Sequence, residues 1–292
     1  MIFSIIKKTL GEKLMPNHNH QKKIALINDI SGFGRCSVAV QQPVISMLKV
    51  QCCPIPTAIF SNHTGFLDFY HLDFTDYMEK YIEMWKKLGL KFNGICTGFL
   101  GSARQINIVS DFINDFKSKG TLVIVDPVMG DYGKPYPTYT KEMCEHMKEL
   151  VILSDIVTPN LTEACILTGI KYREKWTKRE LLALAKKVSD IGPSKVVITG
   201  IPQKTFVCNY CYEKGKEPKL LKTHKIGTSR SGTGDIFTAI IAADAINGVD
   251  FFASVKKASQ FIKKCILRSI ELDIPLTDGV AFEEILYKLS AK

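Results

Sequence analysis

The amino-acid sequence predicts an α/β fold in which helices cover both faces of a mostly parallel central sheet. Short, continuously apolar runs alternate with longer segments whose apolar residues recur at helical spacing. Apolar runs without polar alternation are typical of strands that are buried on both faces, as in parallel sheets. No internal repeat, heptad pattern or low-complexity segment interrupts this alternation. We therefore predict a single domain over residues 23–292, preceded by an N-terminal tail over residues 1–22 that carries no periodicity.

The first predicted strand is Ile24–Ile27, an apolar run that ends at the polar pair Asn28-Asp29. A glycine-containing turn follows and leads into a predicted helix over Arg35–Leu48. The same criteria apply to the next five strands, which we predict at Pro54–Phe60, Gly94–Thr97, Leu122–Val125, Ile156–Thr158 and Val196–Thr199. The helices predicted between them are Tyr77–Leu88, Ala103–Lys117, Lys141–Leu150, Leu161–Thr168 and Arg179–Ser189.

The pattern changes in the last third of the chain. Thr205–Tyr212 and Lys219–His224 have the character of a β-hairpin around the turn at Lys214-Gly215-Lys216. Two or three helices are predicted after Gly234. In open α/β sheets the ligand lies beyond the carboxyl ends of the strands, so the polar residues that directly follow each strand are the candidates for function.

The composition excludes several classes of protein. The 292 residues are 46% hydrophobic and 23% charged, as in ordinary globular domains. No apolar run approaches the length that spans a bilayer, and Met1–Ile6 is followed at once by Lys7-Lys8, unlike a signal peptide. The formal net charge is +10, but the lysines are spread out without interleaved aromatic residues, so we expect no nucleic-acid binding. Nine scattered cysteines are typical of reduced thiols, and we expect a cytoplasmic protein.

The most informative motif is Ser231-Gly232-Thr233-Gly234-Asp235, which leads directly into an apolar helical segment. Two glycines allow the backbone to approach a ligand closely and to turn its N–H groups inward. The free N–H groups and the positive dipole end of the following helix favour an anion. Asp235 could simply cap that helix, but capping alone does not require the two glycines. If an anion is held there, Asp235 can accept a proton from a neighbouring hydroxyl group.

Two further strand ends carry acidic residues. Asp126 and Asp131 follow the predicted strand Leu122–Val125, and Asn160 and Glu163 follow the next one. Oxygen ligands at these positions suit Mg²⁺, either directly or through its water molecules. The alternatives are a turn at Asp126-Pro127 and a capping box formed by Asn160 and Glu163.

These motifs, in this order, resemble the ribokinase superfamily, whose fold is a three-layer α/β/α sandwich. The chain has no GxxxxGK[ST] loop, which disfavours a Walker-type NTPase. Two segments narrow the resemblance to the pyridoxal (vitamin B6) kinases. Phe60-Ser61-Asn62-His63-Thr64-Gly65-Phe66 resembles the stretch that packs an aromatic residue on the pyridine ring, and Thr97-Gly98-Phe99-Leu100-Gly101-Ser102 resembles the segment that lines the same pocket. Taken alone, Phe60 would be a core aromatic residue and His63 a structural one.

The resemblance implies a role for each candidate residue. Asp235 is the general base toward the substrate's hydroxymethyl oxygen, and the N–H groups of Gly232, Thr233 and Gly234 form an anion hole. Substrate contacts are implied for Asp29, Phe60, Thr64, Phe99 and Tyr136. ATP contacts are implied for Asn160, Thr199, Gly200, Gly232 and Gly234. Asp126, Asp131 and Glu163 would hold Mg²⁺ or its water shell.

The implied activity is ATP-dependent phosphorylation of the 5′-hydroxymethyl group of a B6 vitamer by a homodimeric enzyme, and a requirement for a monovalent cation such as K⁺ stays open. The sequence departs from many pyridoxal kinases at its first strand, where Asp29 stands in a shorter turn that ends at Gly34. An Asp there resembles sugar kinases and hydroxymethylpyrimidine kinases of the same superfamily. The leading alternative is therefore a hydroxymethylpyrimidine (phosphate) kinase, followed by a sugar kinase and by a non-catalytic B6-binding protein.

Overall fold

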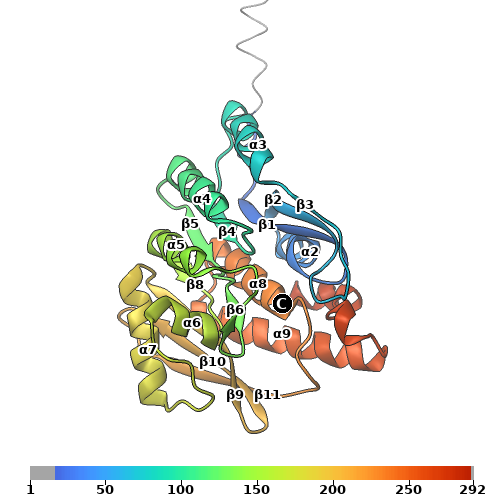
Figure 1. Ribbon diagram of the computed structural model, residues 1–292, viewed down its shortest axis with the longest axis vertical. Coiled ribbons are helices and arrows are strands. Elements are labelled where there is room, and N and C mark those ends of the chain that lie inside the picture. The colour runs from blue at the N-terminus through green and yellow to red at the C-terminus, as the bar shows by residue number, and fades with distance from the viewer. Residues whose placement is uncertain (1–16, 291–292) are drawn as a thin grey trace, which may run out of the picture.

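The computed structural model describes residues 17–290, so residues 1–16 of the predicted tail lie outside the described residues. Its centre is a nine-stranded sheet with the strand order β11-β10-β9-β8-β5-β4-β1-β2-β3 (Figure 1). Six neighbouring strands are parallel: β9 (Lys195–Gln203), β8 (Ile156–Val157), β5 (Leu122–Val125), β4 (Gly94–Thr97), β1 (Lys23–Phe33) and β2 (Gln51–Asn62). Antiparallel strands extend both edges: β3 (His71–Asp73), β10 (Phe206–Glu213) and β11 (Lys219–His224). The predicted mostly parallel sheet is confirmed.

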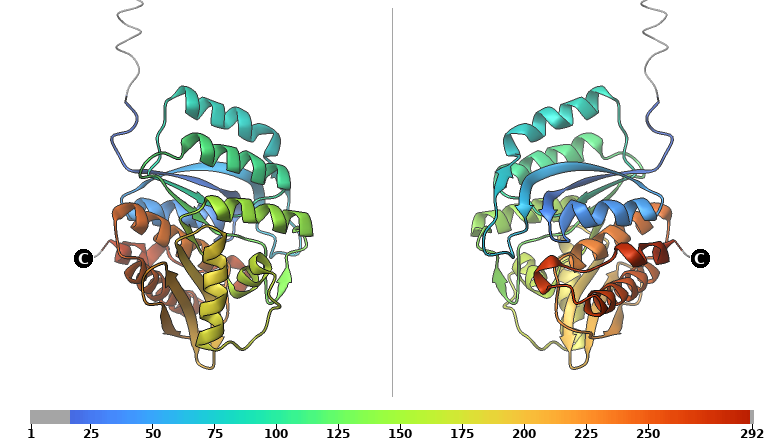
Figure 2. Two further views of the ribbon diagram at one scale, coloured as in Figure 1. Left: turned by 90° about the vertical axis from the view of Figure 1, so that its left-hand side faces the viewer. Right: turned by 90° about the vertical axis from the view of Figure 1, so that its right-hand side faces the viewer.

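Helices cover both faces of the sheet and make it the middle layer of three, as Figure 2 shows. One hydrophobic core lies under α3 (Thr75–Lys87), α4 (Ala103–Phe116), α5 (Lys141–Leu153), α6 (Leu161–Thr168) and α7 (Lys178–Ile191). A second core lies under α2 (Ser37–Met47), α8 (Thr233–Asn247), α9 (Phe251–Glu271) and the short 3₁₀ helix η2 (Glu283–Leu289). In β1, Ala25 and Ile27 belong to the first core, whereas Ile24 and Leu26 belong to the second. Because successive side chains of a strand point to opposite faces, burial on both faces requires an uninterrupted apolar run.

The first strand is longer than its apolar run predicts. The turn expected after Asn28-Asp29 does not form, and β1 continues to Phe33 beside β2. The register shifts there, with Asn28 paired to Pro56 and Ile30 to Ile59, so the polar pair lies at a β-bulge. The strand continues because β2 supplies backbone partners as far as Asn62, which local sequence does not reveal. As a result α2 begins at Ser37 rather than at Arg35.

The strand order reverses beside β1. The chain passes from β1 to β2 on one side, and β4, on the other side of β1, begins the series that leads to β9. A crevice for ligands forms at such a switch point, beyond the carboxyl ends of the strands. The backbone at Gly98, directly after β4, approaches Asn28 so closely that a Cβ atom there would lie 2.4 Å from the Asn28 amide nitrogen.

Two smaller findings complete the fold. Among residues 17–290 there is no helix long and apolar enough to cross a membrane. All nine cysteines are free thiols.

Candidate active site

The loop before α8 packs tightly against the connection between β1 and α2. Gly232 is the N-cap residue of α8, with a φ of 83°, and a Cβ atom at this position would lie 2.1 Å from the Arg35 carbonyl oxygen. Glycine is therefore required here both by the backbone conformation and by the close approach of a second chain segment. Since Gly232 occupies the N-cap, Asp235 lies inside the first helical turn, and the capping alternative considered for it does not hold. The anion hole expected from the N–H groups at this helix start stays a prediction.

Asp235 is half-buried, and the surroundings of its carboxylate shift its pKa. Burial raises the pKa of Asp235 to about 6, and the negative charge of Asp29 acts in the same direction. A hydrogen bond from the Ser37 backbone N–H and one from the Asn28 side chain, 3.5 Å away, oppose the rise. The carboxylate is thus ionised near pH 7 and still basic enough to accept a proton.

Asp126 lies at the carboxyl end of β5, and its side chain interacts with α8. The Thr238 hydroxyl donates to Asp126 Oδ2 over 2.9 Å, and the Thr158 hydroxyl lies 3.1 Å from that of Thr238. Burial raises the pKa of Asp126 to about 7, and the charge of Asp235 contributes to the rise. A cation is favoured beside a buried carboxylate whose pKa is raised by the negative charge of a neighbouring one.

Asn160 and Glu163 form the capping box that was the structural alternative for this pair. The Asn160 side chain accepts from the Glu163 N–H over 3.0 Å, and Glu163 Oε2 accepts from the Asn160 N–H over 2.7 Å. The other oxygen of the buried Glu163 accepts from the Met129 N–H over 3.2 Å. Burial raises the pKa of Glu163 well above its usual range, with a contribution from Asp126. Glu163 therefore supports the backbone around the strand end, and its predicted metal contact remains a prediction.

Asp131 and Tyr136 belong to a small two-stranded flap made of β6 (Gly130–Asp131) and β7 (Lys134–Pro135). The Gly133 N–H attaches the flap to α6, because it donates to the Thr162 hydroxyl over 2.8 Å. The Tyr136 N–H closes the hairpin by donating to the Met129 carbonyl over 2.8 Å. Burial raises the pKa of Asp131 and also that of Tyr136, where the charge of Glu163 adds to the effect. Both predicted residues thus lie on the same flap as expected from their position in the chain.

The acidic residues of the described chain do not by themselves form a complete metal-binding site. Over the described part of the chain, no group of three or more His, Cys, Asp or Glu side chains could hold a metal ion. Mg²⁺ usually keeps several water molecules and binds one or two carboxylates together with the phosphates of a substrate. The carboxylate of Asp126, close to that of Asp235, fits a Mg²⁺ ion that arrives with a nucleotide.

Asp29 is buried, with 5% of its area exposed. The Ser37 hydroxyl donates to its Oδ1 over 2.6 Å, and the Ser31 hydroxyl donates to its Oδ2 over 3.2 Å. Burial raises the pKa of Asp29. Ser37 has a φ of 52°, an uncommon conformation for a serine, and it contacts both Asp29 and Asp235. Asp29 therefore lies beside the candidate base, with both oxygens already hydrogen-bonded.

Two of the predicted substrate-binding aromatic residues, Phe60 and Phe99, lie in one cluster, whereas Tyr136 lies on the flap. The ring of the buried Phe60 stacks on His71 at 5.4 Å between centroids, and Phe99 packs edge-on against it at 6.1 Å. Thr64 is exposed in the loop after β2. His63 anchors that loop, because its Nε2 donates to the Thr277 carbonyl over 2.6 Å while its Nδ1 accepts from the Gly65 N–H over 3.0 Å. His63 is thus structural, as its residue type alone suggested.

Three of the predicted ATP contacts lie beside one another on neighbouring strands: Asn160 follows β8, whereas Thr199 and Gly200 lie inside β9, which continues to Gln203 instead of ending at Thr199 as predicted. Thr199 forms an isolated β-bridge with Asn160, and its N–H donates to the Pro159 carbonyl over 2.8 Å. Gly200 is exposed, has a φ of 68°, and donates its N–H to the Asn209 side chain over 3.2 Å. The structure therefore brings Asn160, Thr199 and Gly200 together on one side of the sheet edge that carries Asp126.

Sequence reasoning missed the polar residues that surround the candidate base from the second core, above all Asn28, Gln41 and Thr238. Asn28 and Gln41 are buried, and they join Asp235 to β1 and α2. The only signal in the sequence is that Asn28 ends an apolar run, which equally predicts a turn.

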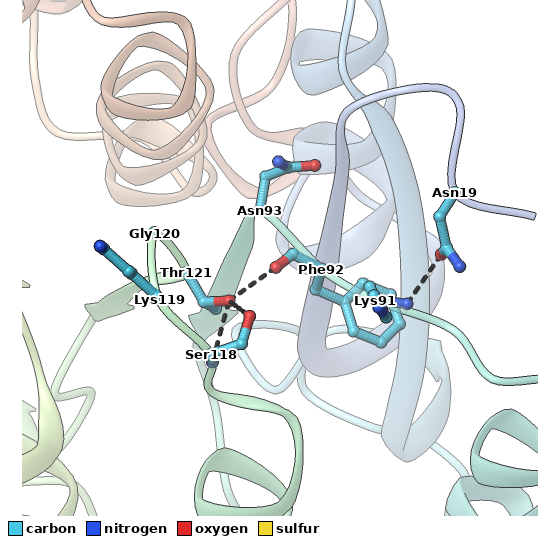
Figure 3. A pocket seen from close by; sticks show the side chains of 8 residues that line it. All are labelled: Asn19, Lys91, Phe92, Asn93, Ser118, Lys119, Gly120 and Thr121. Atoms are coloured by element: carbon cyan, nitrogen blue, oxygen red, sulfur yellow. Dashed lines mark hydrogen bonds between the residues drawn. The ribbon is translucent and has the colours of Figure 1, made fainter.

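A separate pocket opens at the amino ends of β4 and β5 (Figure 3). It has a volume of about 280 Å³ and lies where β4 and β5 begin, with Asn93 and Thr121 directly before those strands. It contains none of the predicted site residues. The residues that line it are Asn19, Lys91, Phe92, Asn93, Ser118, Lys119, Gly120 and Thr121.

Comparison with known proteins identifies a matching family model and similar solved structures. Residues 43–276 match the family model described as phosphomethylpyrimidine kinase. A solved structure of a "putative phosphomethylpyrimidine kinase" from Bacteroides thetaiotaomicron is 38% identical to this chain, with a TM-score of 0.92 and coverage of 94% of this chain and 96% of the other. A second form of that protein, described as containing pyridoxal, has a TM-score of 0.90 and covers 93% of this chain and 96% of the other.

Two further comparisons are less close. The pyridoxal kinase of Arabidopsis thaliana is 33% identical over 207 residues, which amount to 68% of this chain and 65% of that protein. The chain thus spans just under two thirds of the length of this curated relative. A crystal structure of pyridoxal kinase from Lactobacillus plantarum is 21% identical, with a TM-score of 0.85 and coverage of 92% of this chain and 96% of the other. That likeness shows the fold alone.

Proposed function

We propose that this chain, because it belongs to the phosphomethylpyrimidine kinase family with its ribokinase-like fold, is an ATP-dependent kinase that phosphorylates the 5′-hydroxymethyl group of a B6 vitamer. The observation that carries the substrate assignment is the relative at 38% identity whose second form is described as containing pyridoxal. The Arabidopsis relative, named a pyridoxal kinase, supports the same assignment. The reaction type is supported independently by a basic carboxylate, Asp235, in the first turn of a helix that begins with a glycine loop.

In the proposed reaction, Asp235 accepts the proton of the substrate hydroxyl while that oxygen attacks the γ-phosphorus of ATP. The bond between the γ-phosphorus and the bridging oxygen breaks, and ADP leaves. A pKa of about 6 makes Asp235 largely ionised at pH 7, yet able to hold a proton once the hydroxyl oxygen begins to bond to phosphorus. Phosphoryl transfer otherwise needs mainly positioning and charge stabilisation.

The remaining groups would stabilise charge and exclude water. The N–H groups of Gly232, Thr233 and Gly234, at the positive end of α8, would face the transferring phosphoryl group. Mg²⁺, held by ATP, by water and by Asp126, would neutralise charge on the phosphate oxygens. The flap that carries Asp131 and Tyr136 would cover the site. For ATP itself we propose contacts from Asn160, which follows β8, and from Thr199 and Gly200, which lie beside it in β9.

The vitamer would bind between the first two strand ends and the flap. Phe60 and Phe99 would supply apolar contact to the pyridine ring, and Thr64, Asp29 and Tyr136 would face its polar groups. Because Asp29 lies beside Asp235, a vitamer that contacts Asp29 would point its hydroxymethyl group at the Asp235 carboxylate.

A second candidate function is the phosphorylation of hydroxymethylpyrimidine or its phosphate, and the description of the matching family favours it. The two are separated by measuring ATP-dependent phosphorylation of pyridoxal, pyridoxine, pyridoxamine and hydroxymethylpyrimidine by the same preparation. A thermal-shift series with these compounds and with sugars, each with and without MgATP and with K⁺ or Na⁺, reports binding without turnover. Phosphorylation of a B6 vitamer supports the main proposal, whereas phosphorylation of the pyrimidine alone overturns it. Binding of a vitamer without ATP consumption would indicate a non-catalytic B6-binding protein.

Asp29→Ala should raise KM for pyridoxal strongly and leave KM for ATP nearly unchanged, because the ATP contacts lie at other strand ends. A lost hydrogen bond to a charged group is worth about 1.5–3 kcal/mol, or roughly ten- to a hundredfold in kcat/KM. Phe60→Ala should act in the same direction through lost apolar contact. Steady-state kinetics with each substrate varied in turn measures the split. Asp29→Asn is the matched control, because it retains an acceptor for Ser37. Impaired use of ATP with normal use of pyridoxal would reverse the proposed orientation of the site.

We also propose that the protein is a homodimer. Six large apolar side chains are exposed at the end of β1, on β2, on the segment that leads to β3 and on β3 itself: Phe33, Ile59, Leu67, Phe69, Tyr70 and Leu72. Leu67 is 97% exposed and Tyr70 is 74% exposed, and apolar surface of this kind gathered on one edge is typical of an interaction site.

Sedimentation should therefore show a dimer that Leu67→Asp together with Tyr70→Asp converts to a monomer. Tyr287→Asp, at an exposed tyrosine on η2, is the control and should leave the dimer intact. A wild-type monomer at all concentrations would contradict the proposal.

The free thiols of all nine cysteines support a further proposal, that the enzyme acts in the reducing cytoplasm.

A further inference from the structure

One buried side chain joins the candidate base to three separate elements. Asn28 lies at the bulge of β1, next to the switch point of the sheet, and only 1% of its area is exposed. A polar side chain so deeply buried is costly unless its hydrogen-bonding groups are satisfied.

Every hydrogen-bonding position of the Asn28 amide is used. Its Oδ1 accepts from the backbone N–H of Asp29 over 2.9 Å and from that of Phe99 over 2.8 Å. Its Nδ2 donates to Gln41 Oε1 over 2.8 Å and to Asp235 Oδ1 over 3.5 Å. Backbone N–H groups can only donate, so they determine which end of the amide carries the oxygen. The nitrogen must therefore face Asp235.

The amide is also held in place by its surroundings. Gly98 leaves no room on one side, because a Cβ atom there would lie 2.4 Å from Asn28 Nδ2. Gln41, which is fully buried on α2, holds the other side. The Asn28 side chain is thus a fixed connection between β1, the end of β4, α2 and the first turn of α8.

We propose that Asn28 is a positioning residue that holds the Asp235 carboxylate toward the substrate hydroxyl by joining it to β1, β4 and α2. This inference rests on the proposed function of Asp235 as the base. It assigns to Asn28 no contact with the substrate or with ATP. Two consequences follow, one for the geometry and one for the charge of the base.

The geometric consequence is that loss of the Asn28 donor should lower kcat without changing KM for ATP. The electrostatic consequence follows from the groups that face Asp235. Asn28 and the Ser37 N–H stabilise its ionised form, Asp29 destabilises it, and Asp126 lies close enough for its own pKa to respond to the Asp235 charge. The Asn28 side chain is one of three hydrogen-bond donors that favour the ionised form, beside the backbone N–H groups of Ser37 and of Asp235 itself, and it is the one that a substitution can remove. The base should then require a higher pH to ionise.

Asn28→Asp is the decisive variant, because it keeps the oxygen that accepts from Asp29 and Phe99 and replaces the nitrogen that donates to Gln41 and Asp235 by a second acidic oxygen. At pH 7 we expect kcat to fall about tenfold, because a rise in the pKa of the base from about 6 to about 8 would lower its ionised fraction at that pH by about tenfold. KM for ATP and the dissociation constant of a nonhydrolysable ATP analogue should stay within about twofold of wild type. The acid limb of kcat/KM should move to higher pH, so that activity partly recovers as the pH rises. Asn28→Ala should lower kcat in the same direction.

Asn93→Ala is the matched control. The Asn93 side chain also accepts from a backbone N–H of β1, that of Lys23 over 3.0 Å. Asn93 directly precedes β4, however, and so lies at the amino ends of the strands, away from Asp235 (Figure 3). It should leave kcat and the pH profile unchanged. Melting temperatures of all variants are measured in parallel, so that loss of folding is separated from loss of turnover.

The outcomes distinguish this inference from the function on which it rests. A wild-type enzyme without kinase activity, or an active Asp235→Asn variant, would remove the proposed function itself. An active wild type, an inactive Asp235→Asn and an Asn28→Asp variant with normal kcat would overturn the inference alone. A loss in Asn28→Asp that is equal at every pH, or that Asn93→Ala reproduces, would also overturn it, because that pattern indicates only a structural role.

Discussion

Asp235→Asn should reduce kcat by a factor on the order of 10² or more while leaving KM for ATP nearly unchanged. The amide has the shape of the carboxylate but cannot accept the proton of the substrate hydroxyl. The wild-type enzyme should lose kcat/KM as the pH falls through about 6, the pKa to which burial raises Asp235, and the variant should lack this acid limb. Single-substrate kinetics over pH 5 to 9 measures both effects. A variant with near-wild-type turnover would exclude Asp235 as the base.

The same substitution should not destabilise the fold. A raised pKa means that the folded state holds the proton of Asp235 more tightly than the unfolded state, so ionisation costs stability progressively from about pH 4, and the full cost is present above about pH 6. Replacement by Asn removes this cost at neutral pH, and the melting temperature should be equal to that of wild type or higher. Asp244→Asn is the control on the same helix, because buried Asp244 is paired with Lys257 and accepts from Ser254. That variant should lose stability and keep its kcat.

Gly232→Ala should lower the melting temperature substantially and abolish most of the activity. The glycine has a φ of 83°, which an alanine adopts only with strain, and its Cβ atom would lie 2.1 Å from the Arg35 carbonyl oxygen. Because that contact is with backbone atoms, a side-chain rotation cannot relieve it. Differential scanning fluorimetry and kinetics on the same samples measure the two losses. A Gly232→Ala protein with wild-type stability would show that the loop and the β1–α2 connection are free to separate.

Gly234→Ala is the matched comparison two residues further along. No protein atom lies within 4 Å of the position that its Cβ atom would take, so the variant should fold normally. The methyl group would enter the space at the start of α8 that we assign to the phosphoryl group. We therefore expect a raised KM for ATP or a lowered kcat at an unchanged melting temperature. Wild-type kinetics in Gly234→Ala would contradict this placement of the phosphoryl group.

The amount of the fold that could be predicted differs from element to element. β4 at Gly94–Thr97, β5 at Leu122–Val125 and α6 at Leu161–Thr168 have the predicted bounds, because each coincides with a local apolar pattern. β1 was predicted to end at Ile27 but extends to Phe33, because the additional residues are held by hydrogen bonds to β2. A local pattern records which faces of a segment are apolar, whereas strand length depends on the partner strand.

The candidate site shows the same division. The chemical type of Asp235, Asp126 and Asp131, and their positions after strands or at a helix start, were readable from the sequence because glycine loops and strand ends have local signatures. The capping box of Asn160 and Glu163 was also readable, but only as one of two alternatives. Whether those residues contact metal or ATP depends on groups that belong to no local pattern.

By itself, then, the sequence determined the layered α/β architecture and the identity of the groups at the strand ends, because both are set by residues close together in the chain. Only the tertiary structure decided which of these groups meet. It enclosed Asp29 between two serine hydroxyls, attached the β2 loop to Thr277 through His63, and brought Asn28 to Asp235 across 207 residues of chain. The pKa of Asp235 was decided in the same way, because desolvation and the charge of Asp29 act through space and depend on the packing of β1 against α8.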